Sequence, residues 1–123
     1  MHDGYYTAEA TDFDDEGWKP FITVYVSDNR IVTVEYNARD ASGFIKSWDV
    51  DYTRRMRDEA GTYPSKYIRA YAAALLDKQN PAWINAIPGA EKSHILFKAL
   101  SEAVISQAIT GDKSIVFIEL PAN

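Results

Sequence analysis

The sequence predicts a single α+β domain spanning residues 1–123: an antiparallel sheet with a central β-hairpin and about three packed helices. Two runs with alternating apolar residues, 18–26 and 30–37, flank Asp28-Asn29 and predict the hairpin. Three later apolar stripes recur at helical spacing and predict helices near 48–60, 64–78 and 91–109. The 123 residues, 46% of them hydrophobic, are enough for one core.

The remaining elements follow from local signals. Residues 3–10 form a short segment rich in residues that favour β-strands, and they predict a first strand. An acidic loop at 12–16 follows this strand. The β-rich run 114–119 predicts a last strand. Gly61 and Gly111 follow helical stripes, where glycine ends a helix, and Pro64 suits a first helical position.

One core is expected to collect apolar side chains from both the sheet and the helices. The last helix is expected to present Ile95 on the same face as Leu96 and Leu100. The predicted core members are Phe21, Val24, Val34, Ile68, Leu75, Leu96, Leu100 and Phe117.

Composition and missing motifs exclude several function classes. A formal charge of −5 argues against binding to nucleic acid or to an anionic membrane, and no apolar stretch reaches the roughly 18 residues of a membrane span. The absence of cysteine removes thiolate metal sites and cysteine nucleophiles. The two histidines lack metal-ligand spacing, the 12–16 run lacks calcium-loop spacing, and serine-hydrolase, P-loop and dinucleotide-binding motifs are missing. No metal site and no catalytic residue is therefore predicted.

Five segments, in order, resemble the FMN-binding domain family of bacterial flavoproteins. The match covers nearly the whole chain. Its segments are Asp3-Gly4-Tyr5-Tyr6, Gly17-Trp18-Lys19-Pro20-Phe21, Ile31-Val32-Thr33-Val34-Glu35-Tyr36, Gly61-Thr62-Tyr63-Pro64, and Ala86-Ile87-Pro88-Gly89-Ala90 with the helix after it. The resemblance implies a domain that binds FMN and carries electrons rather than a substrate-specific enzyme.

The chain departs from the family at the flavin phosphate motif. In the family a Ser-Gly-Ala-Thr turn opens a helix, and in covalent members its threonine is esterified to the FMN phosphate. Here the turn reads Pro88-Gly89-Ala90-Glu91. Gly89 and Ala90 retain a backbone turn whose free N–H groups suit a phosphate, but Glu91 has no hydroxyl to esterify. Binding of FMN is therefore expected to be noncovalent.

The resemblance assigns two groups of cofactor-binding residues. The phosphate group is expected at the start of the last helix, and the flavin ring at three loop residues. The phosphate residues are Gly89, Ala90, Glu91, Lys92, Ser93 and His94; the ring residues are Trp18, Tyr63 and Pro64. The alternatives are that Glu91 only complements the helix dipole and that Trp18 and Tyr63 only cover neighbouring elements.

Partner and location follow from the same family. A redox partner protein is expected, with no nucleic acid and no membrane insertion by this domain. An extracytoplasmic or membrane-associated setting, reached through a segment absent from this chain, is favoured over a cytoplasmic one. The alternative function is a flavin-free structural or partner-binding module that retains the fold.

Overall fold

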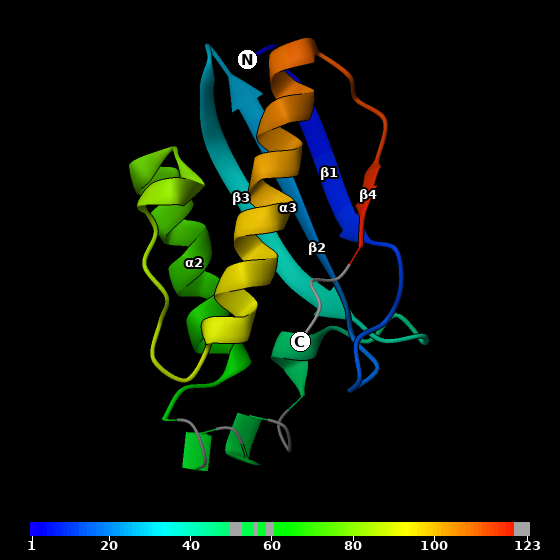
Figure 1. The fold of residues 1–123 in the computed structure, drawn as a ribbon, viewed down its shortest axis with the longest axis vertical. Coiled ribbons are helices and arrows are strands. Elements are labelled where there is room, and N and C mark those ends of the chain that lie inside the picture. Colours follow the sequence, from blue (N-terminus) through cyan, green and yellow to red (C-terminus); the bar gives the residue numbers. More distant parts are fainter. Residues whose placement is uncertain (50–52, 56, 59–60, 120–123) are drawn as a thin grey trace.

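A four-stranded sheet covered on one face by two long helices makes up the chain (Figure 1). The computed structural model describes residues 1–49, 53–55, 57–58 and 61–119. The elements are β1 (Gly4–Ala10), β2 (Lys19–Ser27), β3 (Arg30–Arg39), the 3₁₀ turn η1 (Lys46–Trp48), α2 (Pro64–Lys78), the 3₁₀ turn η2 (Pro81–Trp83), α3 (Glu91–Thr110) and β4 (Val116–Ile118). The predicted α+β class is confirmed.

The hairpin forms where the sequence predicts it. β2 and β3 pair antiparallel from Lys19–Arg39 to Ser27–Arg30, with one bulge near Tyr25. Asp28 and Asn29 adopt left-handed φ values of 53° and 61°, which suit a tight two-residue turn.

The sheet is mixed rather than wholly antiparallel. Its strand order is β3-β2-β1-β4, β1 runs antiparallel to β2, and β4 runs parallel to β1. The path of α3 explains the direction of β4. The helix ends beside the start of β1, where the His2 N–H donates to the Ala108 carbonyl at 2.7 Å. A strand that follows α3 therefore enters the sheet from the same end as β1.

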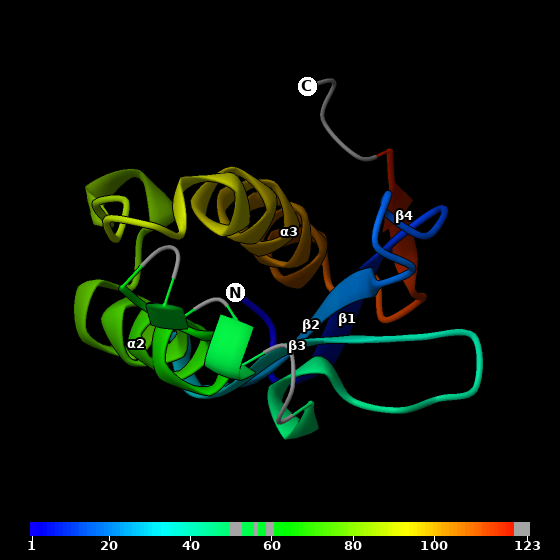
Figure 2. The ribbon, with the colours of Figure 1, turned by 90° about the horizontal axis from the view of Figure 1, so that it is seen from below.

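Both α2 and α3 pack on one face of the sheet, seen along the strands in Figure 2. Val24, Ile68, Leu75 and Leu100 lie in the core between these layers, with the half-buried Val34 packed against them. Phe21 and Leu96 are also buried, although neither belongs to the central cluster.

Two apolar positions differ from the prediction. Phe117 is 56% exposed because the short edge strand β4 turns it away from the helices, opposite Glu9. Ile95 is 54% exposed, and Phe97 is buried in its place. The buried stripe of α3 thus keeps Leu96 and Leu100 and includes Phe97 on its other side.

The predicted helix at 48–60 falls partly on residues outside the described ones, namely 50–52, 56, 59 and 60. Residues 53–55 and 57–58 are helical. Trp48, the predicted first residue, instead ends the 3₁₀ turn η1, and Asp49 after it is extended. The α2 boundaries match the prediction, and α3 extends one residue beyond it.

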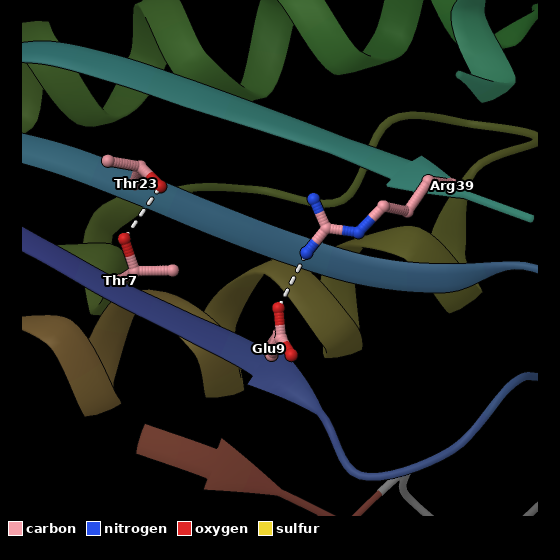
Figure 3. Close-up of polar contacts among 4 residues, drawn as sticks. All are labelled: Thr7, Glu9, Thr23 and Arg39. Carbon is pink, nitrogen blue, oxygen red and sulfur yellow. Dashed lines mark hydrogen bonds and ion pairs between the residues drawn. The ribbon is translucent and has the colours of Figure 1, made fainter. Parts of the chain in front are cut away.

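The sheet face away from the helices carries cross-strand polar pairs. Thr7 and Thr23 share a hydrogen bond of 2.8 Å, and Arg39 forms a 2.6 Å ion pair with Glu9 (Figure 3). The Arg39 guanidinium also lies 4.6 Å from the centre of the Phe21 ring, which explains why Phe21 is buried on this face.

Gln79 joins the end of α2 to the edge strand β3. It ends the helix with a left-handed φ of 61°. Its side-chain oxygen accepts from the Ile31 N–H at 2.8 Å, and its amide nitrogen donates to the Ile31 carbonyl at 2.9 Å. One side chain thereby fixes the position of the helix end against the sheet.

Candidate functional site

A cavity of about 210 Å³ lies where the sheet, η1 and the first turn of α3 meet. β3 contributes Tyr36 to its wall, η1 contributes Lys46, and α3 with its preceding turn contributes residues 89–93. Asp14 and Glu16 of the acidic loop also line it. The cavity therefore brings together segments that are distant in the sequence.

The turn into α3 is fixed by a buried tyrosine of α2. Gly89 has a left-handed φ of 87°, and the Ala90 N–H donates to the Ile87 carbonyl at 2.8 Å. The Tyr71 hydroxyl donates to the Ala90 carbonyl at 2.9 Å and accepts from the Ile87 N–H at 3.0 Å. Tyr71 thus holds both ends of the turn on the helix layer.

Glu91 folds back over the start of its own helix. Its carboxylate accepts a hydrogen bond of 3.0 Å from the Gly89 N–H. That bond, followed by one from the Glu91 backbone N–H, lowers the pKa of the carboxyl group below its ordinary value. Glu91 therefore complements the positive end of α3 and occupies a donor that the family resemblance assigns to phosphate.

A hydroxyl pair forms part of the cavity wall. The Tyr36 and Ser93 hydroxyls are 2.6 Å apart, and the Tyr36 hydroxyl also donates to the Ser93 carbonyl at 3.3 Å. Burial raises the pKa of Tyr36 well above its ordinary value. Tyr36 therefore stays protonated and offers a neutral hydroxyl beside the first turn of α3.

Two lysines reach the cavity from different elements. Lys46 comes from η1 and is half-buried, whereas Lys92 comes from the first turn of α3 and is exposed. Burial lowers the pKa of Lys46; the charges of Asp14 and Glu16 act against that decrease, and the charge of Lys92 adds to it. Sequence reasoning missed Lys46, because no local motif marks a residue that only the tertiary fold brings to α3.

The predicted phosphate residues are brought together with one exception. Gly89, Ala90, Glu91, Lys92 and Ser93 all line the cavity. His94 is not among the lining residues: its Nε2 lies 2.7 Å from the Ile84 carbonyl oxygen, and its ring packs beside Tyr71. Because His94 lies one residue further along α3 than Ser93, its side chain points toward Ile84, at the end of η2.

The predicted ring residues are not among the residues that line this cavity. Trp18 is only 6% exposed at the entry to β2, and its backbone N–H donates to Asp14 at 2.9 Å. Tyr63 and Pro64 form the start of α2, where Pro64 is fully buried and Tyr63 is half-buried. Trp18 therefore contacts the loop before β2, and Tyr63 and Pro64 form the start of α2.

The cavity wall combines groups that can donate hydrogen bonds to a phosphate with three carboxylates. Lysine ammonium groups, hydroxyls and backbone N–H groups are the donors that bind phosphate. Its volume of about 210 Å³ is below the roughly 300–1,000 Å³ of typical small-molecule sites. The lysines, the Ser93 hydroxyl and the backbone N–H groups supply such donors, whereas the carboxylates of Asp14, Glu16 and Glu91 in the same lining would repel a phosphate.

Two other kinds of site are absent from the described part of the chain. No three His, Asp or Glu side chains there gather closely enough to hold a metal ion. None of the helices described combines the length and apolar character needed to cross a bilayer.

Comparison with known proteins gave one curated relative and two solved structures. No family model matches the chain. It is 37% identical over 113 residues to the 15 kDa lipoprotein of Treponema pallidum (strain Nichols), covering 92% of this chain and 80% of the relative. The crystal structure of the CPE2226 protein from Clostridium perfringens matches with a TM-score of 0.94 and 33% identity, over 98% of this chain and 99% of that one. A solution NMR structure from Clostridium thermocellum matches with a TM-score of 0.61 and 28% identity, over 88% and 92%.

Proposed function

The chain belongs to the family of the Treponema pallidum 15 kDa lipoprotein. From the resemblance of its segments to FMN-binding domains, we propose that it is a noncovalent FMN-binding domain that carries electrons in an envelope-associated redox chain. Its electron-transfer partner would be another protein. FMN, when bound, supplies the redox chemistry, and the protein supplies binding and orientation.

One observation carries the proposal: the first turn of α3 shares a cavity with Lys46 and Lys92. A phosphate monoester carries a charge of about −1.5 to −2 near neutral pH. The two ammonium groups and the backbone N–H groups at the start of α3 would hold that charge against repulsion from the lining carboxylates of Asp14, Glu16 and Glu91. Glu91 carries no hydroxyl, so no phosphoester forms at this position.

The proposed location rests on the relative. The Treponema relative is named a lipoprotein, and the lipid of a lipoprotein attaches it to a membrane surface. We propose the same bacterial, membrane-associated and extracytoplasmic setting for this chain. In that setting the domain itself would lie beside the bilayer, and a lipid-bearing segment would provide the attachment.

A flavin-free structural or partner-binding module is the second candidate. The bond between the Glu91 carboxylate and the Gly89 N–H favours it, because the protein's own carboxylate already satisfies part of the phosphate-binding turn. The small cavity volume favours it as well.

Replacing Glu91 with threonine tests the two functions. Removing the carboxylate frees the Gly89 N–H and removes repulsion of the phosphate, so FMN affinity should rise. Repulsion between partly solvated unit charges about 4 Å apart is worth roughly 1–4 kcal/mol, or about fivefold to several-hundredfold in affinity. Flavin fluorescence titration of wild type and Glu91→Thr measures the change.

Two controls make the result specific. Riboflavin lacks the phosphate and should respond little to Glu91→Thr. Glu102→Thr removes an exposed carboxylate from the same helix outside the cavity and should leave FMN affinity unchanged. If neither wild type nor Glu91→Thr binds FMN at millimolar concentration, the electron-carrier proposal fails in favour of the flavin-free module.

A further inference from the structure

We propose that β4 pairs with β4 of a second copy of the chain, so that two four-stranded sheets join into one continuous sheet. β4 is the last strand in the order β3-β2-β1-β4, and among the described residues it pairs only with β1. It lies at the edge of the sheet away from α2 (Figure 1). The proposal concerns this edge alone and is independent of flavin binding.

The backbone of β4 presents free polar groups at this edge. Ile118 faces β1, because its carbonyl accepts from the Thr11 N–H at 2.8 Å. In a parallel pair the N–H and C=O of one residue point to the same side, and those of the next residue point to the other side. Phe117 and, by the same alternation, Ile115 and Glu119 therefore direct their backbone groups outward. Such outward groups allow an edge strand to pair with a strand of another chain.

The side chains along this edge are apolar where they are exposed. Ile115 and Phe117 are 52% and 56% exposed, whereas the alternate residues Val116 and Ile118 are half-buried and pack against the core. Pairing with another strand would place Ile115 and Phe117 beside further apolar side chains and remove part of their surface from water.

One register makes the strand complementary to itself. In an antiparallel pair centred on Val116, residues equally far before and after Val116 lie opposite each other. Phe117 then lies opposite Ile115 of the second copy, and Lys113 lies opposite Glu119. Each contact occurs twice across the two-fold axis, and aromatic–β-branched and opposite-charge pairs are the cross-strand pairs that stabilise antiparallel strands. A pair centred on Phe117 would instead place Glu119 opposite Ile115, so the sequence favours the register centred on Val116.

The two charges are available for this contact. Among the described residues neither Lys113 nor Glu119 forms a salt bridge, and both are exposed. The Lys113 side chain lies beside Gly4, and its ammonium group would turn outward to meet Glu119 of the second copy. Because each copy offers the same surface to the other, the assembly closes at two copies.

Exchange of the two charges tests the register in the intact chain. Lys113→Glu and Glu119→Lys each place like charges opposite each other twice, so each should weaken the dimer about 10- to 100-fold. The double variant restores opposite charges and should dimerise as wild type does. Lys98→Glu, at an exposed position of α3, changes the net charge as Lys113→Glu does and is the matched control. Sedimentation equilibrium measures the dissociation constant of each dimer.

Rescue by the double variant requires contact between copies. Residues 113 and 119 are six positions apart, and six residues of extended chain span up to about 20 Å, which is too far for an ion pair within one strand. A double variant that dimerises as weakly as the single variants overturns the register centred on Val116.

Phe117→Asp tests the edge itself. It places a carboxylate opposite Ile115 of the second copy and should abolish the dimer, while circular dichroism should show a folded chain because Phe117 is exposed. The proposal is overturned if wild type stays monomeric up to millimolar concentration. It is also overturned if Phe117→Asp and the single charge variants dissociate no more than Lys98→Glu does.

Discussion

Tyr71→Phe removes the hydroxyl that holds the turn before α3 and leaves the ring in place. Two hydrogen bonds are lost, one to the Ala90 carbonyl and one from the Ile87 N–H. Each contributes about 0.5–1.5 kcal/mol net, so the variant should lose about 1–3 kcal/mol of unfolding free energy. Since Tyr71 and Ala90 are almost fully buried, water cannot readily replace the lost partner.

Urea denaturation measures this loss directly, and thermal melting should show a decrease of roughly 3–15 °C for a domain of this size. Tyr5→Phe is the matched control, because Tyr5 is 66% exposed on the opposite sheet face and should change stability by less than about 0.5 kcal/mol. If Tyr71→Phe is as stable as Tyr5→Phe, the hydroxyl does not hold the turn and the description of the site is wrong.

Two further predictions concern the core and the start of α3. Leu100→Ala should cost about 2–5 kcal/mol in urea denaturation because Leu100 is fully buried, whereas Ile95→Ala on the exposed side should cost far less; similar losses would contradict the assigned helix face. Because the fold lowers the pKa of Glu91, its carboxylate stabilises the fold at pH values above its ordinary pKa of 4.5. This contribution is lost as the pH falls through the lowered pKa. The melting temperatures of wild type and Glu91→Gln should therefore differ at neutral pH and converge in acid, and a constant difference would contradict this.

Local patterns were sufficient to predict most of the fold. The alternation around Asp28-Asn29 and the stripes of α2 and α3 are properties of short segments, and the structure places all three near the predicted residues. The direction of β4 is not local: it depends on where α3 ends relative to β1. The exposure of Phe117 follows from that arrangement, because a β-rich run does not reveal which of its faces meets the core.

The candidate site likewise contains residues that the sequence could predict and residues that it could not. Gly89 to Ser93 form a continuous motif, and the structure gathers them on one cavity. Lys46 could not be predicted, since only the packing of η1 beside β3 brings it there. The sequence left two roles open for Glu91, and the contact of its carboxylate with the Gly89 N–H depends on a side-chain conformation that spacing alone does not determine.

Gln79 also has a consequence for encounters between copies of the protein. An edge strand can recruit a strand from another chain through its outward N–H and C=O groups, which leads to domain swapping or aggregation. At Ile31 both groups are already bonded to the Gln79 amide, which imitates a paired backbone within the same molecule. A foreign strand aligning along the start of β3 must displace that amide first, so a side chain at a helix end hinders pairing between copies of the protein at this edge.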